Sequence, residues 1–146
     1  MEFLKQYLDI GVFAILGFMS IVALACVLER VISYSRVKVE RYRELERLKV
    51  DLNKGLPIIA TVASNAPYVG LLGTVFGIML TFYDIGQSGQ IDTQSVMVGL
   101  ALALKATALG LFVAIPAMVF YNLLVAKAET LLSYWKIAHG IGDTSK

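Results

Sequence analysis

The sequence predicts an all-α membrane protein with three transmembrane helices, and its composition and charge pattern lead to this fold class. Hydrophobic residues make up 58% of the 146 residues and charged residues 16%, against about 45–50% and about 25% in soluble domains. Long stretches of the chain carry almost no charge, and basic residues gather between the first two of these stretches. The net charge of +2 is too small to indicate a nucleic-acid partner.

The first uncharged stretch covers residues 10–28, between Asp9 and Glu29. A helix needs about 20 apolar residues to cross about 30 Å of hydrocarbon, so this stretch predicts a span. A secretory signal peptide is the alternative interpretation. It fits poorly, because a signal peptide begins with a basic segment, whereas here the charges of Glu2, Lys5 and Asp9 nearly cancel.

The second stretch lies between Lys54 and Asp84, and Pro57 and Pro67 interrupt its beginning. We therefore place the second span at about residues 66–83.

The third stretch gives a span at about residues 96–122, with Lys105 as its only charge. It is longer than a bilayer requires, so we expect it to tilt or to project beyond the membrane. Residues 84–92, between the second and third spans, form a short polar turn with two glycines, which predicts a helical hairpin. Asp92 or Thr93 is expected to cap the third helix.

The distribution of basic residues predicts the orientation of the chain. Segment 29–54 holds most of them, whereas the turn at 84–92 has none and the N-terminus has only Lys5. Because basic loops stay in the cytoplasm, we expect the N-terminus and the 84–92 turn on the outer side of the membrane. The connector 29–65 and the tail 123–146 would then be cytoplasmic, and residues 1–146 would form a single membrane domain.

The connector contains an amphipathic helix, because Leu45, Leu48 and Leu52 recur at helical spacing among charged residues. This helix could lie against its own chain as a solvated helix. It could instead pack against other copies or against cytoplasmic extensions of the second and third spans. Leu131 and Trp135 give the tail a similar apolar stripe.

Residues that would support enzymatic or metal chemistry are scarce in the sequence. The chain has no P-loop motif. Cys26 is the only cysteine and His139 the only histidine, so a disulfide framework and a His- or Cys-rich metal site are excluded. We expect no enzyme activity, no cofactor and no metal.

Small residues recur at helical spacing in the second and third spans, where they let helices approach closely. The glycines in these positions are Gly70, Gly73, Gly77 and Gly110. Pro67 and Pro116 are expected to kink their helices. Three thin spans enclose little by themselves, so we expect some of the small-residue faces to meet neighbouring copies in a homo-oligomer.

Lys105 is the informative charge, because it lies about nine residues inside the third span, or about 13 Å deep at 1.5 Å per residue. A charge at that depth costs at least about 2.5–3.5 kcal/mol. The acids next to the spans, including Asp9, all lie at span edges, so we expect any anionic partner on another protein. Snorkelling to the outer surface is the alternative.

Thr74 and Thr107 lie at nearly the same depth on the two hairpin helices. A threonine in a membrane helix often bonds only to the carbonyl four residues before it. Two hydroxyls at one depth could instead line a hydrated path that passes protons, because each donates and accepts a hydrogen bond.

The hairpin resembles a known family. Residues 66–79 (APYVGLLGTVFGIM) are similar to the second-span signature of the ExbB/TolQ branch of the MotA/TolQ/ExbB proton-channel family. Residues 106–117 (ATALGLFVAIPA), followed by Tyr121 and Asn122, are similar to its third-span signature. ExbB is the most similar branch, and residues 1–65 match only in topology.

The resemblance implies a homo-oligomeric ring, usually a pentamer, in the bacterial inner membrane, with the N-terminus in the periplasm. The ring would surround the transmembrane helices of an ExbD-like partner that carry an aspartate. Proton flow through such a complex drives motion that a TonB-like protein passes to outer-membrane transporters, for example for siderophore uptake. The threonines matching Thr74 and Thr107 would face the pore. A TolQ-like role in envelope maintenance and a non-conducting membrane scaffold are the alternatives.

Two features depart from the family pattern. Leu102 stands where members usually carry a glutamate, and Lys105 lies one turn further on roughly the same helix face. We therefore hypothesise that Lys105 pairs with the aspartate of the ExbD-like partner and favours its ionised form. The connector 29–65 is also shorter than in the longer ExbB proteins, which predicts a smaller cytoplasmic vestibule.

Overall fold

The computed structural model describes residues 2–141, and helices account for nearly all of them. The elements are α1 (Glu2–Arg36), the 3-10 helix η1 (Val39–Arg41), α2 (Leu45–Asn53), α3 (Leu56–Ser88) and α4 (Thr93–Ala138). Three helices, α1, α3 and α4, are long and apolar enough to cross a membrane. The predicted all-α fold with three membrane-length helices is therefore confirmed. The end of the predicted tail, 142–146, lies outside the described residues.

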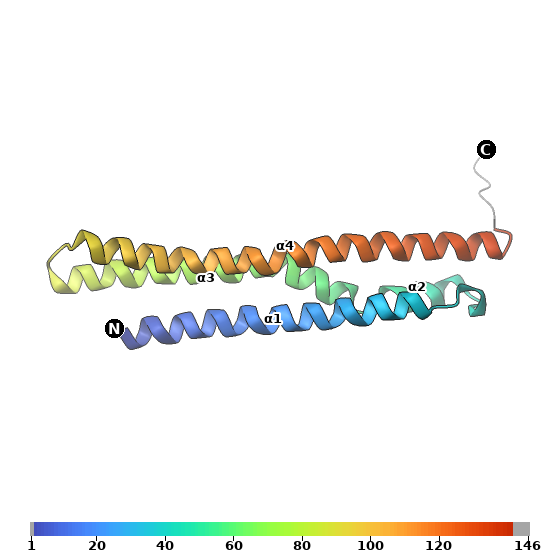
Figure 1. Ribbon diagram of the computed structural model, residues 1–146, viewed down its shortest axis with the longest axis horizontal. Helices are drawn as coiled ribbons and strands as arrows, with labels where there is room; N and C mark the ends of the chain where they lie inside the picture. The colour runs from blue at the N-terminus through green and yellow to red at the C-terminus, as the bar shows by residue number, and fades with distance from the viewer. Residues whose placement is uncertain (1, 142–146) are drawn as a thin grey trace, which may run out of the picture.

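The three long helices lie side by side in an elongated bundle (Figure 1). Helix α4 runs in the same direction as α1, and α3 runs antiparallel to both. The tip of the α3–α4 hairpin extends beyond the N-terminus of α1, and α2 lies at the opposite end of the bundle (Figure 1).

Local sequence signals set the ends of α3. Gly55 adopts a left-handed conformation with φ of 76°, and Pro57 lies in the first turn, where a missing N–H costs nothing. The helix therefore begins at Leu56, inside the predicted connector, and reaches the membrane as one continuous helix. The helix ends at Ser88 and is capped by Gly89, with φ of 65°, whose N–H donates to the carbonyl of Ile85.

The turn that closes the hairpin confirms Asp92 as the cap of α4. Its carboxylate accepts hydrogen bonds from the backbone N–H groups of Gln94 and Ser95, each at 3.2 Å. These bonds satisfy two of the N–H groups that the first turn of a helix leaves unpaired. The Ser95 side chain and these backbone donors also hold the pKa of Asp92 below its usual value.

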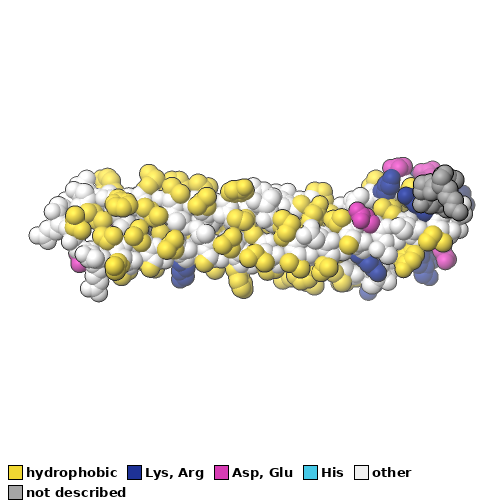
Figure 2. All heavy atoms as spheres, turned by 90° about the horizontal axis from the view of Figure 1, so that it is seen from above, with side chains coloured by type: hydrophobic (Ala, Val, Ile, Leu, Met, Phe, Trp, Pro, Cys, Tyr) yellow, Lys and Arg dark blue, Asp and Glu magenta, His cyan; other side chains and the backbone are white. Residues whose placement is uncertain are grey.

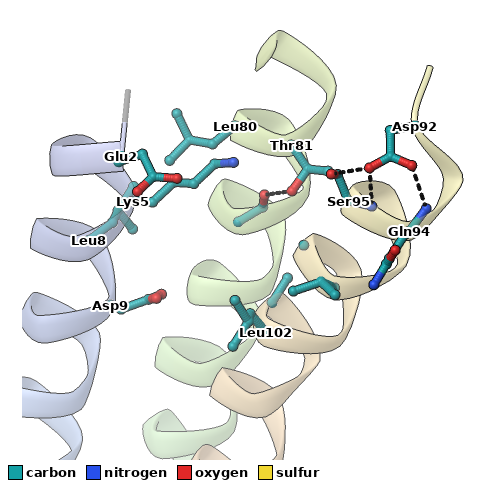
Figure 3. Close-up of a pocket in the computed structure, with 14 residues that line it drawn as sticks. Glu2, Lys5, Leu8, Asp9, Leu80, Thr81, Asp92, Gln94, Ser95 and Leu102 are labelled. Atoms are coloured by element: carbon teal, nitrogen blue, oxygen red, sulfur yellow. Dashed lines mark hydrogen bonds between the residues drawn. The ribbon is translucent and has the colours of Figure 1, made fainter. Parts of the chain in front are cut away.

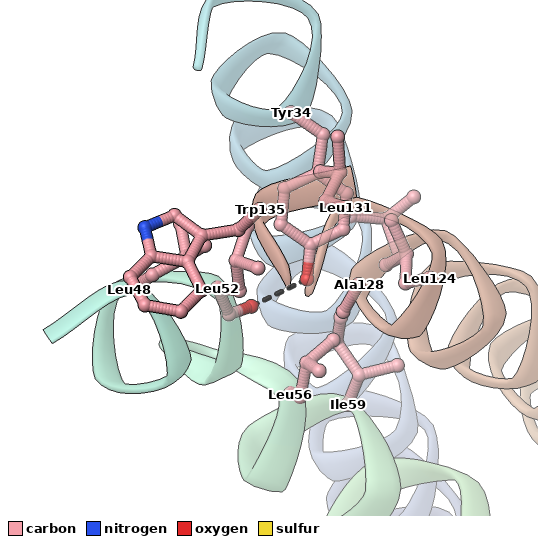
Figure 4. Close-up of a cluster of buried hydrophobic side chains, with 10 residues drawn as sticks. Tyr34, Leu48, Leu52, Leu56, Ile59, Leu124, Ala128, Leu131 and Trp135 are labelled. Atoms are coloured by element: carbon pink, nitrogen blue, oxygen red, sulfur yellow. Dashed lines mark hydrogen bonds between the residues drawn. The ribbon is translucent and has the colours of Figure 1, made fainter. Parts of the chain in front are cut away.

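Helix α2 packs against the parts of α3 and α4 that extend beyond the predicted spans, which is one of the alternatives left open by the sequence. Leu48 and Leu52 are almost fully buried in a cluster with side chains from α1, α3 and α4 (Figure 4). We call this group the α2 cluster; its buried members are Val27, Tyr34, Leu48, Leu52, Leu56, Ile59, Leu124, Ala128, Leu131 and Trp135.

The surface divides into an apolar length and a charged end. Apolar side chains cover most of the face seen in Figure 2, whereas Lys, Arg, Asp and Glu gather at one end. That end contains η1 and α2, as the basic residues of the connector require. The apolar length is the part of the surface suited to lipid or to other transmembrane helices.

Candidate functional site

The small residues of the hairpin bring the backbones of α3 and α4 into direct contact. A Cβ atom added at Gly70 would lie 2.6 Å from the carbonyl oxygen of Ala106, and one added at Gly110 would lie 2.6 Å from that of Ala66. We call this contact line the hairpin seam; it comprises Gly70, Gly73 and Gly77 of α3 and Gly99, Ala103, Ala106 and Gly110 of α4.

The hairpin seam fixes which residues of the two helices lie at the same level. Gly77 faces Ala103, and Thr81 faces Gly99 one turn further toward the hairpin tip. The two expected kink sites, Pro67 and Pro116, lie within α3 and α4, and both helices continue through them.

The seam brings Thr74 and Thr107 together. Thr74 is buried, Thr107 is half-buried, and their hydroxyl oxygens are hydrogen-bonded to each other. The Thr74 hydroxyl also lies 2.9 Å from the carbonyl oxygen of Ala103 on α4 and 3.3 Å from that of Gly70. The alternative of a bond only to the preceding turn is thus too simple, because the shorter contact crosses the seam.

Each hydroxyl has a single proton, which limits how these contacts can be made at one time. The short distance favours Thr74 donating to Ala103, with Thr107 donating to Thr74. In the reverse arrangement Thr74 donates to Thr107. The Thr107 hydroxyl can then donate only to the carbonyl oxygen of Gly70, at 3.5 Å. That last contact is too long for a good O–H···O bond. The pair therefore has a preferred orientation and a weaker reversed one.

Lys105 lies on a different side of α4 from Thr107, the threonine that contacts Thr74. Thr107 is two positions further along the chain, and this spacing corresponds to about 200° around a helix. The Lys105 side chain is exposed, and its ammonium nitrogen lies 5.6 Å from the ring centroid of Phe13 on α1, in a cation–π arrangement. Leu102 is also exposed, one turn closer to the hairpin tip.

The register of α1 corrects the expectation that no acid lies at the depth of Lys105. A Cβ at Gly73 would touch both Val12 and Ala106, so Val12 and Ala106 are level. Because α1 and α4 are parallel, Asp9 lies only about two residues, or about 3 Å along the helix axis, further toward the hairpin tip than Lys105. Aligning each span by its own apolar ends missed this, since the hairpin projects past the N-terminus of α1.

Asp9 lines a groove of about 500 Å³ between α1, α3 and α4 at the hairpin end (Figure 3). We call it the Asp9 groove; its lining includes Glu2, Lys5, Asp9, Thr81, Asp92, Gln94, Ser95, Leu102 and Ala103. Figure 3 shows Asp9 directed from α1 toward the other two helices. The sequence analysis did not find this groove, because it depends on how α1 packs against the hairpin.

A second cluster of polar side chains, at the charged end of the bundle, was also not predicted from the sequence. Arg30 is buried, and its guanidinium donates to the backbone carbonyl of Asp51 at 2.8 Å and to Glu29 at 2.9 Å. The Tyr42 hydroxyl donates to Asp51 at 2.7 Å, which lowers the pKa of Asp51 and raises that of Tyr42. These contacts hold the connector in place.

No group of three or more His, Cys, Asp or Glu residues within residues 2–141 is arranged to hold a metal ion. His139 stacks on Trp135 at the end of α4, with ring centroids 4.1 Å apart. Cys26 is a half-buried residue beside the α2 cluster.

The chain belongs to the MotA/TolQ/ExbB proton channel family, which it matches over residues 22–137. It is 56% identical to the biopolymer transport protein ExbB of Aquifex aeolicus over 140 residues, covering 96% of this chain and 95% of that protein. It is 54% identical to the ExbB of Helicobacter pylori strain J99, over 94% of each chain.

Similarity extends to TolQ proteins over a shorter length. The chain is 44% identical to the Tol-Pal system protein TolQ of Pseudomonas aeruginosa over 106 residues, which is 73% of this chain and 43% of that protein. Together with the three apolar helices, these relationships support a multi-pass protein of the inner membrane.

Proposed function

We propose that the chain is the proton-conducting stator subunit of an inner-membrane complex that converts the proton motive force into mechanical work. The observation that carries the proposal is the hydroxyl pair of Thr74 and Thr107, held at the hairpin seam of a chain that belongs to a proton channel family. Two hydroxyls that exchange donor and acceptor roles can relay a proton along a file of water molecules.

In the proposed complex, several copies of the chain form a ring, with five as the expected number. The ring surrounds the single-span helices of an ExbD-like partner, and a TonB-like protein carries the motion to outer-membrane transporters. The N-terminus and the hairpin tip face the periplasm, and the α2 end faces the cytoplasm. This orientation agrees with the basic residues at the charged end. Proton transfer is the only chemistry that we assign to the chain, without cofactor or metal.

The ExbB role is favoured over the TolQ role by the higher identity to the ExbB proteins of Aquifex and Helicobacter, 56% and 54% over nearly the whole chain, against 44% to the Pseudomonas TolQ. The chain covers about the whole length of the ExbB proteins of Aquifex and Helicobacter but less than half of the Pseudomonas TolQ. TonB-dependent import, for example of siderophores, is therefore the proposed process, with envelope maintenance as the alternative.

The test is proton flux into proteoliposomes that hold the purified chain, with and without the single-span partner, under an imposed membrane potential. We expect flux only with the partner, and we expect Thr107→Val to reduce it to the partner-free background. Valine keeps the shape of threonine but removes the hydroxyl. Thr130→Val is the matched control, because Thr130 is exposed and bonds only to Ala126 of its own helix, at 2.9 Å.

A non-conducting scaffold is the second candidate, and the apolar side chain of Leu102 favours it. A correctly assembled complex that shows no flux, even with the TonB-like protein bound, would establish this second role. Unchanged flux in Thr107→Val would remove the hydroxyl pair from the proton path.

A further inference from the structure

The Asp9 groove holds an acid that the proposed function does not use. Asp9 is half-buried and points into the groove from α1 (Figure 3). Lys5, one turn before it, is engaged elsewhere, because its ammonium pairs with Asp84 on α3. Within residues 2–141, no Lys, Arg or His nitrogen lies within 4 Å of the Asp9 carboxylate.

Lys105 is a basic side chain that, within residues 2–141, likewise has no oppositely charged group beside it. No carboxylate within residues 2–141 lies within 4 Å of its ammonium, whose nearby aromatic partner is Phe13. Cation–π contact compensates a charge only in part, and an isolated ammonium in hydrocarbon is strongly disfavoured.

The helix spacing places the two charges across one groove. Asp9 and Phe13 are four residues apart and share a face of α1, while Leu102 and Lys105 are three apart and share a face of α4. Phe13 touches Lys105, and Asp9 and Leu102 line the same groove, so these two faces oppose each other. The axial offset is about two residues, or about 3 Å, which is well within the reach of about 6 Å of an exposed lysine side chain.

We propose that Asp9 is the counter-charge of Lys105, and that the two form an intramembrane ion pair within one chain when the Lys105 side chain turns from Phe13 toward the Asp9 groove. The pair joins α1 to the hairpin at the level where the groove ends. Ala103 connects it to the hydroxyl pair, because Ala103 lines the groove and its carbonyl accepts from Thr74 at 2.9 Å. This proposal replaces a carboxylate on another protein as the partner of Lys105, and it does not depend on proton conduction.

The test is a double-mutant cycle on the thermal stability of the full-length chain, purified without its single-span partner. We expect Asp9→Asn to lower Tm by about 2–4 °C or more, the shift that about 1 kcal/mol causes in a chain of this size. In a Lys105→Met background the same substitution should leave Tm nearly unchanged, because the charge that it would leave unpaired is absent.

Glu2→Gln is the matched control, because Glu2 lines the same groove about two turns further from Lys105. It removes the same charge, and its effect should be the same with and without Lys105. If a single variant fails to accumulate in membranes, accumulation of the Asp9→Asn/Lys105→Met double variant at the wild-type level gives the same comparison.

An equal effect of Asp9→Asn in both backgrounds would overturn the proposal. So would a Lys105→Met effect that appears only when the single-span partner is bound, because the counter-charge would then lie on that partner. Both results are measured without proton flux, so they are independent of whether the proposed function holds.

Discussion

The hairpin seam and the α2 cluster are both built on α4, yet they hold their helices together in opposite ways. The seam uses residues with little or no side chain, and its closest approaches are between backbones. The α2 cluster uses large side chains, with Trp135, Leu48 and Leu52 almost fully buried (Figure 4). The same helix therefore changes its packing chemistry between the membrane-length part and the charged end.

The surrounding solvent explains this difference. Among lipid tails there is no hydrophobic gain in burying a leucine, so helices associate by close packing of small residues. At the charged end water surrounds the chain, and burial of large apolar side chains becomes favourable. Hydrogen bonds there also hold a connector that is not continuous helix: Trp135 donates to the Tyr42 carbonyl at 2.8 Å, and Tyr34 donates to that of Leu52.

The comparison of the hairpin seam with the α2 cluster predicts that substitution of Trp135 causes the largest loss of stability. Trp135→Ala should remove about 3–5 kcal/mol from the free energy that docks α2, the usual loss for a buried tryptophan. Hydrogen exchange of the α2 amides should then accelerate more than about 100-fold, because each 1.4 kcal/mol is a factor of about ten. Ile137→Ala, at a residue 71% exposed, is the control. Unchanged exchange in Trp135→Ala would show that the cluster does not hold α2.

A smaller loss is expected at the seam. Gly110→Ala places a methyl group against the backbone of α3 and should reach the upper end of the about 1–3 kcal/mol typical of overpacking. Tm of the purified chain measures it. Gly17→Ala is the matched control, because within residues 2–141 an added Cβ would meet no atom within 4 Å beyond its own helix backbone, and the gain in helix propensity is the same. Equal Tm values for the two variants would mean that the seam is not closely packed.

The smallest effect is a pH dependence of the α2 region. Asp51 has a lowered pKa, so its bond to Tyr42 stabilises fully above the ordinary aspartate pKa and is lost as pH falls through the lowered value. Tyr42 has a raised pKa, so its contribution is full below the ordinary tyrosine pKa and is lost as pH rises through the raised value.

The stability of the α2 region at each pH is measured by urea unfolding, followed by the fluorescence of Trp135, the only tryptophan. The α2 region should be most stable between about pH 5 and pH 9. Tyr42→Phe should flatten the profile and lower it slightly, whereas Gly110→Ala should leave its shape unchanged. A Tyr42→Phe profile identical to wild type would contradict the assignment.

Most of the helical architecture follows from the sequence, because its signals are local. The charge-free stretches predict the long helices, Asp92 is a recognisable cap, and the spacing of Leu45, Leu48 and Leu52 predicts α2 within the connector. The surface against which α2 packs could not be chosen from the sequence, because the same apolar stripe could pack equally well against a neighbouring copy.

The candidate site was less predictable, because it depends on which residues of neighbouring helices lie at the same level. The depths of Thr74 and Thr107 could be counted from the ends of their own spans, and the structure places them in contact. The relation of Asp9 to Lys105 could not be counted in this way. It is set by Val12 meeting Gly73 beside Ala106, a contact between residues far apart in the chain.

The unbroken length of α4 means that any tilt of this helix would be amplified along it. Its 46 residues extend about 69 Å, roughly twice the thickness of the hydrocarbon layer. If the hairpin tip acts as the pivot, a tilt of about 10° moves the opposite end sideways by about 12 Å for a helix of that length. A small change of angle within the bilayer thus becomes a large displacement of Trp135 and the α2 cluster.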